Sequence, residues 1–320
     1  DIPVWNPDNC IQCNFCSYVC PHAVIRPVVM NEEEAAAAPA NMKKVPMTGM
    51  PGLYFSMTIS ALDCTGCGSC ANICPGKKGE KALTMDLLSK NLDEQPVFDF
   101  GQKVADKPEV LAKFKETTVK GSQFKQPLFE FSGACAGCGE TPYAKLITQL
   151  FGERMYIANA TGCSSIWGNS SPSTPYTVNK RGQGPAWDNS LFEDNAEFGY
   201  GMVLANNALR DWLKDKVTAV YESDKSSDEV KAACKEWLDT FSIGSKNGAA
   251  TDKLVAALEG IDCPTCKEIL DNKDFLAKKS QWIFGGDGWA YDIGFGGLDH
   301  VLASGQDLNI MVFDTEVYSN

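Results

Sequence analysis

The chain has 320 residues, of which 44% are hydrophobic and 22% charged, a composition typical of a globular protein of about two domains. Acidic residues outnumber basic ones by 41 to 29, so a nucleic-acid-binding surface is not expected. No apolar run approaches the roughly 18 residues that span a bilayer, and we expect no membrane partner. The chain starts at Asp1 without Met, basic region or apolar leader, so we expect a portion of a longer polypeptide.

The cysteines carry most of the information in this sequence. There are 14 of them and only two histidines, and many cysteines are separated by two residues. Secreted disulfide frameworks usually occur in short chains, whereas this spacing favours metal or cluster ligation in a reducing compartment. We therefore expect a cytoplasmic protein.

Two runs of four cysteines share the spacing C-x2-C-x2-C-x3-C-P. Two-residue gaps let a tight loop place three thiolates on one cubane, and the fourth cysteine then ligates the other cluster. This predicts two [4Fe–4S] clusters, one held by Cys10, Cys13, Cys16 and Cys74, the other by Cys64, Cys67, Cys70 and Cys20. The alternatives are zinc sites or buried thiols, but zinc pairs lack the third and fourth cysteines at these offsets.

The two runs resemble the two-cluster bacterial ferredoxin domain at all eight cysteines. The resemblance implies an α+β ferredoxin-like domain over residues 1–100, with an unusual insertion between its halves at residues 21–63. His22 is expected to be an exposed or packed residue, because the cluster corners are already filled. Residues 101–130, rich in lysine, are expected to form a connector.

From residue 131 the sequence has an α/β pattern. Thr141-Pro142 predicts the start of a helix, with Thr141 as N-cap and a buried face formed by Leu146, Ile147 and Leu150. Residues 155–158 read as a buried strand. Further along, Ser226-x-x-Glu229 predicts a capping box that opens another helix.

The last segment predicts a βαβ unit. Residues 281–284 form the first strand, 285–288 a glycine turn, 293–302 a helix and 308–313 a second, parallel strand. The glycine turn and Thr315 then lie at carboxyl ends of parallel strands, where open α/β sheets bind ligands. The expected domain is an α/β fold with a mostly parallel sheet over residues 131–320.

Six cysteines lie outside the two runs. A third cluster is expected at Cys135, Cys138 and Cys163, although one CxxC pair also fits a zinc knuckle or a redox dithiol. Cys263 and Cys266 are expected to be exposed thiols or a dithiol pair, and Cys234 lies on an apolar helical stripe and is expected in the core.

The turn Gly286-Asp287-Gly288 carries separate chemistry. Glycines let the backbone approach a diphosphate, and Mg²⁺ prefers oxygen ligands that bridge a carboxylate to substrate phosphates. The Asp287 carboxylate, the Thr315 hydroxyl and the Val317 carbonyl could supply three of them. A simple turn is the alternative.

Taken in order, the ferredoxin runs, the third cysteine set and the GDG turn resemble pyruvate:ferredoxin oxidoreductase, within the 2-oxoacid:ferredoxin oxidoreductase family. The resemblance covers essentially the whole chain, as a central-to-late portion of the single-chain form. Its most specific motifs are FSGACAGCGETPY at 131–143, TGCSSIW at 161–167 and WIFGGDGWAYDIGFGG at 282–297.

This resemblance implies the cofactors and their contacts. It implies three [4Fe–4S] clusters, thiamine diphosphate and Mg²⁺, with the fourth ligand of the third cluster further downstream than residue 320. It implies a catalytic role for Asn320 and a cofactor-binding stretch with these members: Glu140, Cys163, Gly286, Asp287, Gly288, Trp289, Thr315, Glu316, Val317, Tyr318, Ser319 and Asn320.

The implied reaction is the oxidative decarboxylation of pyruvate with coenzyme A to acetyl-CoA and CO₂. The thiazolium ring of the cofactor accepts electrons, which then pass through the three clusters to ferredoxin or flavodoxin. A homodimer with the rest of the polypeptide is expected. The alternatives are another 2-oxoacid:ferredoxin oxidoreductase and a non-enzymatic, polyferredoxin-like electron carrier.

Overall fold

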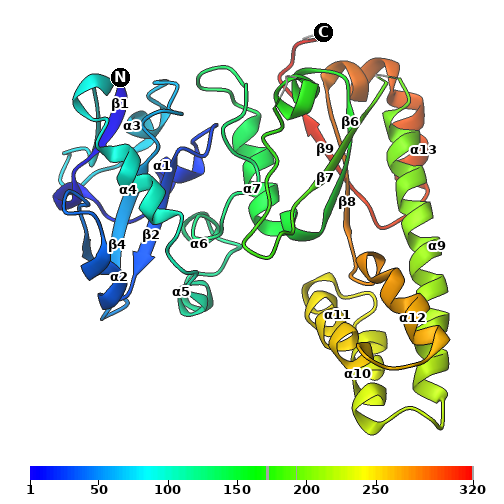
Figure 1. Cartoon of the computed structure of the whole chain (residues 1–320). Helices are drawn as coiled ribbons and strands as arrows, with labels where there is room; N and C mark the ends of the chain where they lie inside the picture. The colour runs from blue at the N-terminus through cyan, green and yellow to red at the C-terminus, as the bar shows by residue number, and fades with distance from the viewer. Residues whose placement is uncertain (171–172, 192, 319–320) are drawn as a thin grey trace. The chain divides into compact units, whose positions relative to one another are not determined.

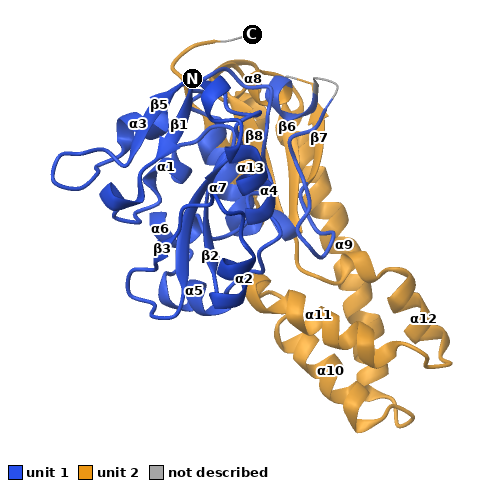
Figure 2. Ribbon diagram, turned by 60° about the vertical axis from the view of Figure 1, so that its left-hand side comes forward, with its two compact units in different colours: residues 1–153, 166–185 blue, residues 154–165, 186–320 orange. Residues whose placement is uncertain are grey.

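The computed structural model describes residues 1–170, 173–191 and 193–318, and the chain folds into two compact units (Figure 1, Figure 2). The first unit consists of Asp1–Glu153 and Ile166–Pro185, and the second of Arg154–Ser165 and Ala186–Asn320. Within the described residues, no helix combines the length and the apolar character needed to cross a membrane.

The first unit has two small antiparallel sheets joined by short helices. β1 pairs with β5, and a second sheet has the order β2-β4-β3. The strands are β1 Ile2–Trp5, β2 Ile25–Met30, β3 Val45–Pro46, β4 Tyr54–Ile59 and β5 Leu83–Asp86. The helices are α1 Phe15–Tyr18, α2 Glu32–Ala37, α3 Ser69–Ile73, α4 Glu94–Gly101, α5 Pro108–Lys113, α6 Val119–Ser122 and α7 Thr141–Phe151.

The insertion at residues 21–63 builds the larger of these sheets. β2 and β4 pair along six residues, from Ile25 opposite Ile59 to Met30 opposite Tyr54. Phe55 and Ile59 are fully buried in the core that also holds Trp5 and several of the motif cysteines. The insertion therefore adds apolar support beneath the cysteine loops.

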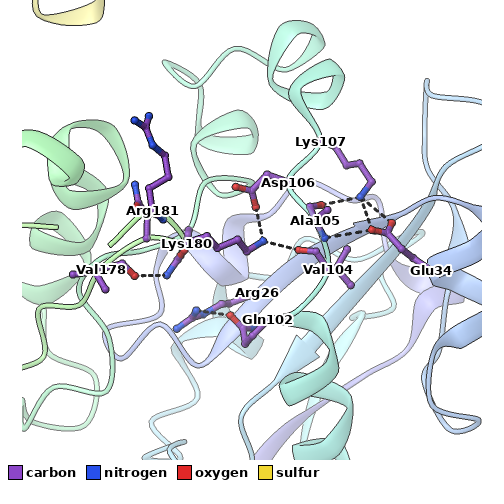
Figure 3. Close-up of polar contacts among 12 residues, drawn as sticks. Arg26, Glu34, Gln102, Val104, Ala105, Asp106, Lys107, Val178, Lys180 and Arg181 are labelled. Carbon is purple, nitrogen blue, oxygen red and sulfur yellow. Dashed lines mark hydrogen bonds and ion pairs between the residues drawn. The ribbon is translucent and has the colours of Figure 1, made fainter. Parts of the chain in front are cut away.

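The predicted connector is anchored to the first unit by ion pairs (Figure 3). The Lys107 ammonium lies 2.8 Å from a Glu34 carboxylate oxygen on α2. Lys180 lies 3.1 Å from the Asp106 carboxylate and donates to the Val104 carbonyl at 2.8 Å. These contacts border a cavity of about 470 Å³ within the unit.

Helix α7 differs from the sequence expectation in its cap and its buried face. Its N-cap is Glu140, so Thr141 is the first helical residue. The buried face consists of Thr141, Ala144, Lys145, Thr148 and Gln149, whereas the predicted apolar face is only half-buried. The face is polar because it meets main-chain carbonyls: Gln149, for example, donates to the Lys125 carbonyl at 2.9 Å. These bonds place α7 in the first unit, so the predicted domain boundary at residue 131 falls inside that unit.

The second unit contains the parallel sheet that the sequence predicts. Its strands run in the order β7-β6-β8-β9, and every neighbouring pair is parallel. The strands are β6 Met155–Ala160, β7 Ala186–Ser190, β8 Ser280–Gly286 and β9 Asn309–Phe313. The short helix α8 Cys163–Ser165 follows β6, and the π-helical turn η6 Trp289–Ile293 and α13 Phe295–Ala303 connect β8 to β9. The predicted βαβ unit is confirmed.

A long helix, α9 Asn195–Glu222, packs against the sheet and α13 along one part and against a helical subdomain along the other (Figure 1). That subdomain is formed by α10 Asp228–Asp239, α11 Gly244–Leu258 and α12 Pro264–Asp271. The predicted capping box at Ser226 is wrong by one residue. Ser227 is the N-cap of α10 and accepts from the Val230 N–H at 3.3 Å, while the Ser226 hydroxyl donates to the Val220 carbonyl instead.

Candidate metal-cluster and cofactor site

The eight motif cysteines line two separate small cavities in the first unit. One cavity is lined by Cys10, Cys13, Cys16 and Cys74, which we call the first set. The other is lined by Cys20, Cys64, Cys67 and Cys70, the second set. Each set therefore combines three cysteines of one run with the fourth of the other, which is the grouping that the spacing predicts.

The two cysteine loops share one backbone geometry. Gln12 and Asn14 in the first run, and Gly66 and Gly68 in the second, have positive φ angles of 57°, 64°, 70° and 77°. The Gln12 N–H donates to the Cys10 sulfur at 3.3 Å. A side chain in the left-handed region costs free energy, and the first run compensates with anchored side chains: the Gln12 amide donates to the Pro46 carbonyl at 3.0 Å and the Asn14 amide to the Lys120 carbonyl at 2.9 Å.

Four thiols of the two sets are poor acids because they are buried. Burial raises the pKa of Cys10, Cys16 and Cys64, and it raises the pKa of Cys70 to about 12. Neighbouring thiols of the same set raise these pKa values further. Thiolates so closely grouped and buried fit a centre whose metal charge deprotonates them.

The two sets surround small cavities. No disulfide joins any of the 14 cysteines. Among the residues that the structure describes, no group of three or more Cys, His, Asp or Glu side chains is arranged to hold a single metal ion.

The loop of the third cysteine pair lies against the second set. The Cys138 N–H donates to the Cys135 carbonyl at 3.0 Å, and a Cβ built on the intervening Gly137 would lie 3.6 Å from Cys67 Cβ. His22 is buried, and its Nε2 lies 3.0 Å from the Ala134 carbonyl oxygen. Cys163, at the start of α8, belongs to the second unit, so its grouping with Cys135 and Cys138 stays a prediction.

Glu140 is held by an aromatic neighbour from the same unit. The Trp167 indole N–H donates to a Glu140 carboxylate oxygen at 2.7 Å. Trp167 is itself buried and packs edge-on against Phe129, with ring centroids 5.2 Å apart. The carboxylate is thus oriented at the start of α7.

The proposed magnesium ligands converge at the carboxyl ends of β8 and β9. The Thr315 N–H and hydroxyl lie 3.0 and 3.3 Å from Asp287 Oδ1, and the same hydroxyl lies 3.3 Å from the Val317 carbonyl oxygen. Burial alone would raise the pKa of Asp287, but the hydrogen bonds from Thr315 and Asp287 N–H groups and from neighbouring side chains outweigh it and lower the pKa. Asp287 is therefore a carboxylate at neutral pH, and three oxygens suited to Mg²⁺ lie together.

The glycine turn also has a packing role. A Cβ at Gly285 would lie 2.3 Å from the Trp289 ring, and the Trp289 side chain is fully buried beneath the turn. Gly286 ends β8, and Gly288 is the N-cap of η6. Glu316 and Tyr318 are exposed beyond β9. Ser319 and Asn320 lie outside the described residues.

The remaining CxxC pair belongs to the helical subdomain. Cys263 is the N-cap of α12, and its sulfur accepts from the Cys266 N–H at 3.4 Å. Cys266 is buried in the core together with Cys234. The expectation of exposed thiols is therefore wrong for Cys266, because the helix turns its side chain inward, and the core position of Cys234 is confirmed.

Sequence reasoning missed one charged residue near the cysteines. Lys145 is 1% exposed on the inner face of α7 and donates to main-chain carbonyls between Cys16 and Cys20. The sequence alone does not reveal this burial. Lys145 lies three residues before Thr148, on the side of the amphipathic helix that the sequence pattern presents as polar.

Known proteins resemble this chain along its entire length. Residues 9–78 match the family profile of the 4Fe-4S dicluster domain. The whole chain is 55% identical over 324 residues to the pyruvate-flavodoxin oxidoreductase of Klebsiella pneumoniae, and 54% identical over 330 residues to the pyruvate:ferredoxin oxidoreductase of Moorella thermoacetica. It is 49% identical over 323 residues to the mitochondrial pyruvate dehydrogenase [NADP(+)] of Euglena gracilis, of which it covers 18%.

The chain covers 27% and 28% of the first two relatives. It carries the 4Fe-4S dicluster domain together with an α/β region built on a parallel sheet. Over its whole length the chain is therefore similar to a segment of the pyruvate-flavodoxin and pyruvate:ferredoxin oxidoreductases.

Proposed function

We propose that this chain is the part of a pyruvate oxidoreductase that binds thiamine diphosphate and relays electrons. The reaction is the oxidative decarboxylation of pyruvate with coenzyme A to acetyl-CoA and CO₂, with ferredoxin or flavodoxin as electron acceptor. The contacts of Thr315 with both Asp287 and the Val317 carbonyl, in a chain that also carries a dicluster domain, are the observation that supports it most directly.

The cofactor is proposed to bind at the carboxyl ends of β8 and β9. Asp287, Thr315 and the Val317 carbonyl would hold Mg²⁺ against the diphosphate, and Glu140 and Cys163 would border the rings. When bound, thiamine diphosphate supplies an electron sink for decarboxylation. The task of this chain's residues is to fix the diphosphate and keep the acidic Mg²⁺ ligand ionised, and the lowered pKa of Asp287 serves this.

The electron relay is proposed to run through three [4Fe–4S] clusters. Cys135, Cys138 and Cys163 would hold the third cluster, and its loop at Gly137 lies next to Cys67 of the second set. Cys16 and Cys20 are separated by only three residues of chain and belong to different sets. This continuity supports the order third cluster, second set, first set, with the external acceptor beyond the first set.

The decisive experiment is turnover of the full-length protein with a panel of 2-oxoacids. We expect reduction of ferredoxin or flavodoxin that requires pyruvate, coenzyme A and bound thiamine diphosphate. Preference for another 2-oxoacid would assign a different member of the wider family. Clusters without extractable thiamine would leave only an electron carrier and would contradict the proposal.

A second acceptor is supported by one comparison. Because the chain is 49% identical to a protein named as an NADP(+)-linked pyruvate dehydrogenase, NADP⁺ belongs in the same assay. Electron transfer to NADP⁺ would leave the proposed cofactor and cluster sites unchanged and alter only the final acceptor.

A further inference from the structure

In the part of the chain that the structure describes, main-chain oxygens alone hold the buried Lys145 ammonium. The Lys145 side chain is 1% exposed. The ammonium donates to the Ser17 carbonyl, to the Tyr18 carbonyl at 3.1 Å and to the Cys20 carbonyl at 3.2 Å. All three acceptors lie on the short segment from Ser17 to Cys20. The three N–H donors of the ammonium are thereby satisfied without a counter-ion.

The lack of a carboxylate partner is unusual for a buried charge. Among the described residues, no acidic side chain contacts Lys145, whereas nearby Arg26 forms an ion pair with Glu130. An isolated buried ammonium is costly unless an opposite charge lies close by. The neighbours able to become anionic here are cysteines: burial lowers the pKa of Lys145 to about 8, and Cys20 and then Cys16 act in the opposite direction.

A second lysine is joined to the other cysteine loop through its backbone carbonyl. Lys120 on α6 is half-buried, with its ammonium 4.1 Å from the centroid of the Phe114 ring. Burial lowers its pKa, and Cys13 and Cys10 of the first set oppose that effect. Its carbonyl accepts the Asn14 amide from within the first cysteine loop. Both lysines lie outside the cysteine motif, one in the connector and one in α7.

We propose that these two lysines set the reduction potentials of the two ferredoxin-type clusters, with Lys145 acting mainly on the second set and Lys120 on the first. Each reduction adds negative charge to a centre already ligated by four thiolates. A fixed cation nearby stabilises the reduced form and raises the potential. The inference rests on the proposed clusters and adds the residues that tune them.

The test is a potentiometric titration of the full-length protein followed by EPR. The signals of the two clusters are first assigned by their loss in Cys10→Ala and Cys64→Ala variants. We expect Lys145→Met to lower the reduction equilibrium constant of the second set at least tenfold, about 59 mV for a one-electron couple, with a smaller change at the first set. Lys120→Met should show the reverse preference.

Two controls separate charge from packing. Lys145→Arg keeps the positive charge and should retain the potential of the second set. Lys107→Met removes a cation that is paired with Glu34 and should leave both potentials unchanged. Unchanged potentials in Lys145→Met with intact clusters would overturn the inference.

The neutral variant could fail to assemble its clusters. Lys145→Gln, which keeps two N–H donors without the charge, then decides by the same criterion. Loss of iron in both neutral variants, but not in Lys145→Arg, would assign Lys145 to assembly and overturn the role in tuning. Absence of iron from the unmodified protein would instead contradict the proposed function itself.

Discussion

Thr315 donates its backbone N–H and its hydroxyl to the same oxygen of Asp287, across 28 residues of sequence, at 3.0 and 3.3 Å. The two residues follow neighbouring parallel strands, so the sheet brings them together. The arrangement fixes one carboxylate oxygen and leaves the other, Oδ2, without a bond to Thr315. A hard cation at this point would find carboxylate, hydroxyl and carbonyl oxygens already grouped.

Replacing Asp287 by Asn should remove the cofactor but not the iron. The change preserves size while it deletes the charge that opposes Mg²⁺, so we expect at least tenfold weaker thiamine diphosphate binding, about 1.4 kcal/mol, and loss of pyruvate decarboxylation in the full-length protein. Cofactor binding by calorimetry, iron content and visible absorbance are the measurements. Asp299→Asn, an exposed change on α13, is the matched control. Normal cofactor binding by the Asp287 variant would show that the GDG sequence is only a turn and does not bind the cofactor.

Cys20→Ala should damage the cluster of the other cysteine run. Its sulfur lines the cavity shared with Cys64, Cys67 and Cys70, so the EPR signal of the second set should disappear while that of the first set persists. Cys74→Ala is the reciprocal control and should affect the first set. The opposite assignment of signals would refute the crossed ligation.

The assembled protein should contain about 12 iron atoms per chain, four for each cubane. Iron and zinc analysis of the full-length protein after anaerobic purification provides the measurement. Eight iron atoms would leave the two ferredoxin-type clusters and remove the third. A preparation that contained zinc in place of iron, or only four iron atoms, would contradict the three-cluster interpretation.

Cys263 and Cys266 should be dispensable for iron binding. Cys263 caps α12 and Cys266 packs in the core beside Cys234, so their double Ala variant should lower the free energy of unfolding but keep the iron. Cys234→Ala is the control for core packing alone. Loss of four iron atoms in the double variant would show that this pair closes the third cluster within the chain.

Two glycines of the second cysteine loop should differ in their tolerance of a side chain. Gly66 and Gly68 both have positive φ, which costs about 1–2 kcal/mol for alanine. At Gly66 the new Cβ would also lie 2.8 Å from the Asp1 carbonyl oxygen, whereas nothing lies within 4 Å at Gly68. Gly66→Ala should therefore reduce the iron occupancy of the second set more than Gly68→Ala, as measured by EPR spin quantification. Equal losses would show that backbone strain alone matters.

The sequence alone determined the parts of this protein that depend on short-range spacing. The C-x2-C-x2-C-x3-C-P runs predicted the crossed cysteine sets, because the reach of a few residues limits which thiols can share one centre. Strand and helix periodicity predicted the βαβ unit and with it the meeting of Asp287 and Thr315. For the cysteine runs, the same local geometry occurs twice. For the βαβ unit, a regular crossover joins two strands, so in both cases local geometry is sufficient for the prediction.

Only the tertiary structure decided which face of α7 is buried. Periodicity favoured Leu146, Ile147 and Leu150, yet the helix turns Lys145 and Gln149 inward because distant carbonyls at residues 17–20 and 125 accept their hydrogen bonds. The close approach of Gly137 to Cys67 is likewise a tertiary contact that no local sequence pattern predicts. A polar side chain becomes a core residue when segments outside its own helix supply its acceptors, and no local pattern encodes that supply.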